Sequence, residues 1–322
     1  MDNSQLFINK YQPIYFDDYD IDDDIINVLK TLVSMDILNI ILIGNVASGK
    51  TSLLNTIIKE YYNEYSFKEY NSNVIYINSL KEQGINYYRN EVKTFCQTCS
   101  NIKNKKKIVV LDDIDLINEQ SQQVFRNCID KYSHNVHFIS SCNNTQKVIE
   151  NLQSRLTSIK ITPLKKDKLF NIITRIKMAE NIIIDEDAEN FIISISNNTV
   201  KVLINYMEKF KLLNEHITLD LANKLCTNIS FITFEEYTSL IKSGDLLGAI
   251  NIIYDIYEQG YSVMDILDNY FIFIKNTDIL NDFQKYNIVQ CISKYIAIFN
   301  NIHEDEIELS LFTNNVIELL HE

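Results

Sequence analysis

The feature that most constrains the fold of this chain is the stretch "IILIGNVASGKTSLL", residues 40 to 54. It contains the spacing Gly-x4-Gly-Lys-Thr, formed by Gly44, Gly49, Lys50 and Thr51. The β-branched run before the loop predicts a buried parallel strand, and the apolar periodicity after it predicts a helix. A strand, a tight loop and a helix in this order aim backbone N–H groups and the helix dipole at a phosphate. The chain has only six glycines, so a chance occurrence of two of them at this spacing is improbable.

The loop predicts a set of nucleotide contacts. Lys50 is expected to reach the β- and γ-phosphates, and Thr51 is expected to ligate Mg²⁺. The interior "NVAS" lacks the usual proline and glycine, which removes some preorganisation but none of the backbone donors. The alternative is a loop with a purely structural role. The predicted nucleotide-binding residues of the loop are Gly44, Asn45, Val46, Ala47, Ser48, Gly49, Lys50, Thr51 and Ser52.

A second motif supplies the acids that a phosphate cradle needs. The stretch "KKKIVVLDDIDLI", residues 105 to 117, predicts an apolar strand that ends in Asp112 and Asp113. Asp112 is the predicted metal ligand, and Asp113 is the predicted catalytic base that orients the attacking water. A buried strand followed by a solvated loop is the alternative interpretation, and the phosphate loop some 60 residues upstream favours the functional one.

The acidic composition limits how the chain can bind nucleic acid. The net charge is −13 and the isoelectric point is near 4.9, so any contact with DNA is expected to be local. We find neither a signal peptide nor an apolar run of membrane-spanning length in the sequence. Six cysteines without a regular framework indicate reduced thiols. Cys96 and Cys99 lack the second pair that a zinc site requires, and we expect them to be inert.

The segments around these motifs resemble the clamp-loader small subunits of the replication factor C type, which are AAA+ ATPases. The resemblance rests on "INKYQPIYFDDYD", "DDIDLINEQSQQVFRNCID" and "HFISSCNNTQKVIENLQSRL", and it extends over essentially the whole chain. It implies that Tyr11 and Pro13 lie against the adenine of bound ATP. It also implies that Asn143, after a strand, is a polar sensor that acts in catalysis.

The same resemblance implies two cationic roles. Arg155, in "QSRL", matches the arginine finger of the family, which acts in trans on the γ-phosphate held by a neighbouring subunit. Lys201 stands where the family has a lid arginine that touches the bound nucleotide. Two departures from the family pattern bear on turnover: Asp113 replaces a glutamate, and Leu156 replaces a cysteine.

The DNA contacts implied by the resemblance are phosphate contacts at helix N-termini and at a few basic residues. The stretch "YINSLKEQGINYYRNEVKTF" is similar to a strand and helix of the family. The candidate DNA-binding residues are Gly84, Ile85, Arg89 and Arg126. The lysine run at residues 103 to 107 is expected to cap a strand rather than to bind DNA.

The expected fold class is α/β, with a P-loop AAA+ domain built on a parallel sheet, then a helical lid and an all-α collar. The predicted domains are an ATPase domain at residues 1–162, a lid at 163–228 and a collar for oligomerisation at 229–322. Amphipathic periodicity predicts three helices in the lid, and the turns "SGD" and "EQGYS" predict paired helices in the collar.

The expected function is that of one subunit in a heteropentameric clamp loader. Such a ring uses ATP and Mg²⁺ to open a sliding clamp and to place it on primer–template DNA. The expected partners are the other loader subunits, the clamp and DNA, without a membrane. The expected location is intracellular, at replication sites in the nucleus or in a viral compartment.

Two alternatives stay open at this point. One is an ATP-binding structural subunit that supplies Arg155 in trans but has little or no hydrolysis of its own. The other is an AAA+ motor on DNA, such as a branch-migration helicase, whose sign would be a C-terminal winged helix. The C-terminal part of this chain is too acidic and too helical in pattern for such a domain.

Overall fold

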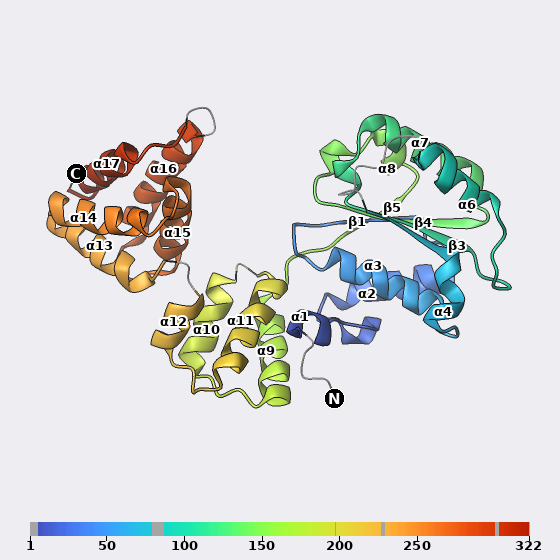
Figure 1. Ribbon diagram of the computed structural model, residues 1–322, viewed down its shortest axis with the longest axis horizontal. Helices are drawn as coiled ribbons and strands as arrows, with labels where there is room; N and C mark the ends of the chain where they lie inside the picture. Colours follow the sequence, from blue (N-terminus) through green and yellow to red (C-terminus); the bar gives the residue numbers. More distant parts are fainter. Residues whose placement is uncertain (1–5, 79–86, 197, 227–228, 300–302, 322) are drawn as a thin grey trace. The chain divides into compact units, whose positions relative to one another are not determined.

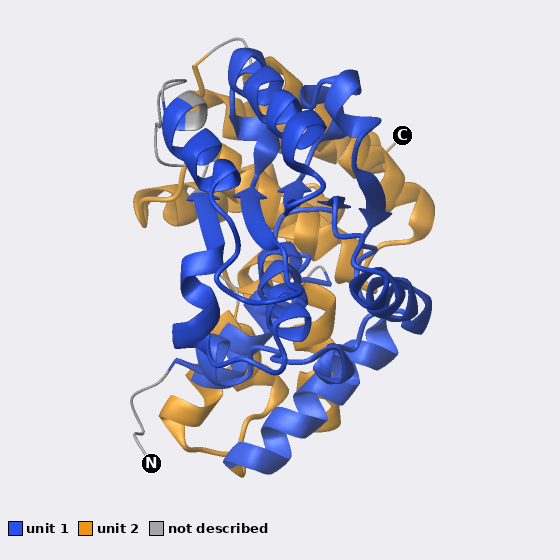
Figure 2. Cartoon of the chain, turned by 90° about the vertical axis from the view of Figure 1, so that its right-hand side faces the viewer, with its two compact units in different colours: residues 1–180, 198–208 blue, residues 181–197, 209–322 orange. Residues whose placement is uncertain are grey.

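The computed structural model describes residues 6–78, 87–196, 198–226, 229–299 and 303–321 (Figure 1). The chain divides into two compact units (Figure 2). Unit 1 comprises residues 1–180 and 198–208, and unit 2 comprises residues 181–197 and 209–322. The division at residues 162 and 228 that the sequence suggests stays a prediction.

Unit 1 is built on a parallel five-stranded sheet with the order β2-β3-β4-β1-β5. The strands are β1 (Ile40–Ile43), β2 (Val74–Asn78), β3 (Lys107–Asp112), β4 (Val136–Cys142) and β5 (Thr157–Lys160). The expected strands after residue 40 and before Asp112 are confirmed. Because all strands are parallel, their carboxyl ends share one edge, where ligands bind in open α/β sheets.

The sheet is covered on both faces, as parallel sheets require. Alternate strand residues face opposite ways, so Ile40 and Leu42 pack with helices α2 and α3, while Ile41 packs with α6 and α7. Figure 1 shows these two helix layers on either side of the strands. The helices and turns of unit 1 up to β4 are α1 (Phe7–Lys10), η1 (Phe16–Asp18), α2 (Asp23–Ser34), α3 (Lys50–Tyr61), α4 (Phe67–Tyr70), η2 (Asn71–Asn73), η3 (Tyr88–Val92), α6 (Lys93–Gln97), η4 (Ile114–Leu116) and α7 (Glu119–Tyr132). Those that follow β4 are η5 (Thr145–Lys147), α8 (Glu150–Gln153) and α9 (Lys166–Glu180).

Three helices expected from amphipathic periodicity after residue 163 are present. They are α9, α10 (Glu186–Ile195) and α11 (Val200–Leu213), and α11 crosses from unit 1 into unit 2. A fourth helix, α12 (Leu219–Cys226), follows them. The three helices predicted from the apolar periodicity are therefore confirmed.

The rest of unit 2 is helical, and every named element of its described residues is a helix. The helices are α13 (Phe231–Ser243), α14 (Leu246–Glu258), α15 (Val263–Asn276), α16 (Asp282–Phe299) and α17 (Ile307–His321). The predicted turn at "SGD" is confirmed, because Gly244 ends α13 with φ +79° and Asp245 caps α14. At "EQGYS", Ser262 and Asp265 form a capping box on α15. None of the helices in the described residues is long and apolar enough to cross a membrane.

Candidate nucleotide site

The loop between β1 and α3 has the backbone shape of a phosphate cradle. A Cβ atom on Gly44 would lie 2.7 Å from Ser48 Oγ and 3.1 Å from the Ile161 carbonyl oxygen, so the position requires glycine. Gly49 has φ +88°, a left-handed conformation that disfavours side chains, and it leads directly into the first turn of α3. Glycine is therefore required at both positions of the motif, at Gly44 because of close contacts and at Gly49 because of its backbone conformation.

Lys50 lies beneath this loop and is only 6% exposed. Its Nζ donates to the carbonyl oxygens of Gly44, at 3.0 Å, and Asn45, at 2.7 Å. Burial lowers the pKa of Lys50, and the carboxylates of Asp113 and Asp112 act in the opposite direction. The ammonium group is thus held within the loop, beside acids that favour its charged form.

Thr51 and Asp112 meet at the carboxyl edge of the sheet, as their proposed role at a metal requires. Thr51 Oγ1 donates to Asp112 Oδ2 at 2.9 Å, although the residues are 61 positions apart. The second oxygen of Asp112 accepts a short hydrogen bond from Ser141. A hydroxyl and a carboxylate are the hard oxygen ligands that Mg²⁺ prefers.

Asp113 and Asn143 also lie together at this edge. Asn143 Nδ2 donates to Asp113 Oδ1 at 3.2 Å. Burial, and then the charges of Asp112 and Asp115, raise the pKa of Asp113, while Lys50 and Asn143 oppose this shift. Asp113 also has φ +54°, a left-handed conformation that ends the extended backbone of β3 at Asp112.

Two residues of the site, Ser141 and Asp115, were not predicted from the sequence. Ser141 accepts from the backbone N–H of Asp113 at 2.9 Å while it donates to Asp112. Asp115, almost fully buried, accepts from the backbone N–H groups of Asn143 and Asn144 at 3.3 and 3.2 Å. The third acid of "DDID" was a visible signal for Asp115, whereas a serine near a strand end carries no signal.

The residues present fit a nucleotide phosphate and its magnesium. The Ser48 hydroxyl is buried without a hydrogen-bond partner among the described residues, and the Cβ direction of Gly49 meets nothing within 4 Å. The first backbone N–H groups of α3 have no acceptor within the helix. Among the described residues there is no cluster of three or more His, Cys, Asp or Glu that could hold a metal. A magnesium ion held by Thr51 and Asp112 would take its remaining ligands from phosphate oxygens and water.

The expected adenine contacts lie on the N-terminal segment of unit 1. Tyr11 donates a short hydrogen bond to Glu180 of α9, and burial raises the pKa of its hydroxyl. The Pro13 carbonyl lies 3.5 Å from Thr56 Oγ1, on helix α3. Lys201 is exposed in the first turn of α11 and makes no hydrogen bond or ion pair with the described residues.

The structure describes only some of the residues that were predicted to act on a neighbouring subunit or to bind DNA. Arg155 donates from Nε to Asp130 at 2.5 Å, and Arg126 Nη2 lies 3.2 Å from the other oxygen of Asp130. Gly84 and Ile85 lie outside the described residues. Arg89 is on η3, but its side chain also lies outside the description.

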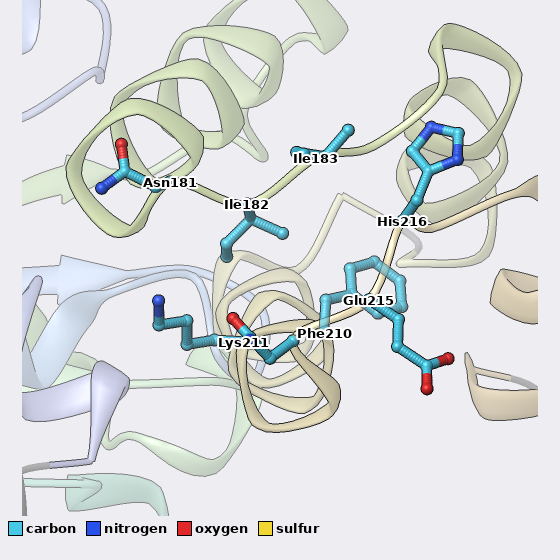
Figure 3. Close-up of a pocket in the computed structure, with 8 residues that line it drawn as sticks. Asn181, Ile182, Ile183, Phe210, Lys211, Glu215 and His216 are labelled. Atoms are coloured by element: carbon cyan, nitrogen blue, oxygen red, sulfur yellow. The ribbon is translucent and has the colours of Figure 1, made fainter.

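A separate small hollow lies in unit 2, beside residues 181–183 and the end of α11 (Figure 3). The side chains of Lys211 and Glu215 point in opposite directions there, so their charges do not converge. His216 Nε2 lies 2.8 Å from Asp185 Oδ1. None of the predicted nucleotide-site residues lines this hollow.

Comparisons with known proteins agree with this geometry. Residues 40–164 match the family described as ATPase family associated with various cellular activities (AAA). A putative replication factor C small subunit of Acanthamoeba polyphaga mimivirus is 29% identical over 281 residues, 86% of each chain. Replication factor C subunit 5 of Mus musculus is 24% identical over 97% of this chain and 89% of its own. A replication factor C small subunit of Methanocella arvoryzae is 27% identical over 83% of each chain.

Solved structures support the fold alone. The RuvB Holliday junction branch migration motor of Thermotoga maritima superposes with a TM-score of 0.54 at 13% identity, over 72% of this chain and 79% of that one. In the described residues from 229 to 321, however, the elements are helices, without the strands of a winged helix. The relatives in sequence and the match at residues 40–164 together show that the chain carries an AAA ATPase domain and is similar over most of its length to replication factor C small subunits.

Proposed function

We propose that this chain is an ATP-hydrolysing subunit of a clamp loader that opens a sliding clamp and places it on primer–template DNA. The observation that carries the proposal is the pairing of Thr51 with Asp112 at 2.9 Å, above a lysine held inside the phosphate loop. Its relationship to replication factor C small subunits supports the process in which the ATPase would act. DNA, the clamp and other loader subunits are the proposed partners, at replication sites inside the cell.

Each residue of the site has a distinct proposed task. The N–H groups of the loop and Lys50 bind the phosphates, and Thr51 and Asp112 hold Mg²⁺. Asp113 accepts a proton from the attacking water and Asn143 orients it, while Arg155 acts on a nucleotide of the neighbouring subunit. When bound, MgATP supplies the transferable phosphoryl group and a metal charge that stabilises it.

A second candidate function is that of a structural subunit that binds ATP but hydrolyses it slowly. Asp113 is one methylene shorter than glutamate, so its carboxylate reaches less far toward a water. Against this candidate, burial raises the pKa of Asp113 and makes it a better proton acceptor. The two effects oppose each other, and only a measurement of turnover separates the candidates.

The test compares three forms of this chain in the ring purified with its natural partners: wild type, Lys50→Ala and Asp113→Glu. We expect Lys50→Ala to weaken ATP binding at this site by about tenfold to a hundredfold, because it removes charge-assisted bonds to phosphate. We expect ring turnover to fall with Lys50→Ala and to be kept or raised with Asp113→Glu.

Each outcome of this comparison has a meaning. Turnover unchanged by Lys50→Ala would leave only the structural role. Calorimetry that shows no uptake of adenine nucleotide by the assembled wild-type protein would overturn both candidates.

A further inference from the structure

The hydrogen bonds of Arg155 to the described residues use Nε and Nη1 of its guanidinium but not Nη2. Nε donates to Asp130 at 2.5 Å, and Nη1 donates to the Asn151 carbonyl at 2.6 Å and to Ser154 Oγ at 3.2 Å. Nη2 has no hydrogen-bond partner among the described residues. The side chain is partly exposed, so this remaining edge is accessible to a phosphate from another molecule.

Asp130 binds a second arginine with its other oxygen. It lies on α7, and Arg126, one turn earlier, contacts Oδ2 through Nη2 at 3.2 Å. The hydrogen bond from Arg155 lowers the pKa of Asp130, with smaller contributions from the charges of Arg155 and Arg126. Two guanidinium groups therefore share one carboxylate, and the group of three keeps a net positive charge.

We propose that Asp130 is a positioning residue for Arg155, which it holds by the Nε edge so that Nη2 is presented to a γ-phosphate in the neighbouring subunit. This inference rests on the proposed function, because it assumes that Arg155 acts in trans. An unrestrained arginine loses rotamer entropy when it is ordered. A side chain already fixed at Nε and Nη1 has lost this freedom before the nucleotide arrives, which is the physical basis of preorganisation.

The contact between Asp130 and Arg155 has two opposite possible roles, inhibition and positioning, and an experiment can tell them apart. If Asp130 withheld Arg155 from the neighbour, its removal would raise turnover. If it positions Arg155, its removal lowers turnover. The sign of the change therefore separates positioning from inhibition.

The experiment measures kcat and KM for ATP in the ring purified with its natural partners. We expect Asp130→Ala to lower kcat about tenfold with KM unchanged, since Arg155 is proposed to act in the transition state. Asp130→Asn keeps an oxygen that accepts from Nε, so we expect it to restore part of the loss. ATP binding at this chain's own site is expected to stay unchanged. If Asp130→Ala fails to assemble, Asp130→Asn alone decides the sign.

A double-mutant cycle adds a readout that a merely structural role would not produce. If Asp130 acts only through Arg155, the double variant Asp130→Asn with Arg155→Ala has the same kcat as Arg155→Ala alone. Asp17→Asn is the matched control, because it breaks another surface ion pair, with Lys30 at 2.6 Å, and is expected to leave kcat unchanged.

The outcomes distinguish this inference from the proposed function. If Arg155→Ala lowers kcat but Asp130→Ala leaves it unchanged or raises it, only the positioning role is overturned. If Arg155→Ala itself leaves kcat unchanged, the trans role is overturned and the positioning role with it.

Discussion

At the scale of single residues, one serine contacts two acids of the candidate nucleotide site. Ser141 donates to Asp112 and accepts from the N–H of Asp113, so it fixes the end of β3 through a side chain of β4. The next residue back, Ser140, is equally buried but donates to the Ile40 carbonyl at 3.2 Å. Adjacent serines therefore hold different parts of the sheet, because neighbouring strand residues face opposite ways.

This difference makes a prediction for magnesium binding. We expect Ser141→Ala to weaken Mg²⁺-dependent nucleotide binding by about tenfold to a hundredfold, as loss of an outer hydrogen bond to a metal ligand commonly does. Titration of nucleotide by calorimetry, with and without Mg²⁺, measures the effect. Ser140→Ala is the matched control and is expected to keep the Mg²⁺ dependence. Equal losses in both variants would show that Ser141 acts only on stability.

At the scale of elements, a polar cluster joins the opposite edge of the sheet to the helices around it. Asp36, just after α2, accepts from Tyr61 at 2.7 Å and contacts His137 Nε2 and Lys106 Nζ, both at 2.8 Å. Lys107 is also buried, and donates to the Phe95 carbonyl at 3.2 Å. These contacts agree with the expectation that the lysine run caps a strand.

The cluster makes the stability of unit 1 depend on pH. Burial would raise the pKa of Asp36, but hydrogen bonds from Lys106, His137 and Tyr61 outweigh it and hold the pKa at about 2, below its ordinary value of 3.8. A lowered carboxyl pKa stabilises the fold above the ordinary value, and this contribution is lost as the pH falls toward 2. Burial lowers the pKa of His137, which also disfavours the fold as the unfolded chain takes up protons below pH 6.5.

We therefore expect Asp36→Asn to lower the free energy of unfolding at pH 7. Solvent reaches 44% of the Asp36 side chain, so the expected loss is about 1 kcal/mol after allowance for screening. The difference from wild type is expected to shrink as the pH falls from 4 toward 2. Denaturant unfolding followed by circular dichroism at several pH values measures it. A difference that does not change with pH would contradict the role of this carboxylate, and Asp17→Asn is an exposed control.

At the scale of the whole molecule, the two units carry different proposed tasks. Unit 1 holds the candidate nucleotide site, and the helices α13–α17 of unit 2 form their own apolar core. Large apolar side chains nevertheless remain on the surface of α16, where Phe283 is 73% and Tyr286 is 67% exposed. They stand three residues apart, on one face of the helix. This face suits the proposed assembly role of the C-terminal helices.

We expect the double variant Phe283→Ser with Tyr286→Ser to weaken assembly with partner subunits at least tenfold, because exposed aromatic side chains contribute strongly to interfaces. Thermal unfolding and ATP binding by the isolated chain are expected to stay near wild type. Co-purification at decreasing protein concentration measures the change. Asn251→Ser, an exposed polar substitution on α14, is the control. Full assembly of the double variant would exclude this face from the interface.

The sequence alone was sufficient to predict those features that depend on residues close together in the chain. The phosphate loop, the strand that ends in Asp112 and the helix boundaries at Gly244 and Ser262 all depend on residues within a few positions of one another. Backbone geometry and capping act over such distances, so the residue pattern determines them. The family resemblance then indicated Asn143 and Arg155, whose local sequence alone is weak.

Only the tertiary structure decided which side chains meet. Ser141 lies 29 positions from Asp112, and Asp130 lies 25 from Arg155. The register of β3 against β4 brings the first pair together, and the packing of α7 beside α8 brings the second. Hydrogen bonds between distant residues depend on this packing to within tenths of an ångström, and no local pattern encodes it.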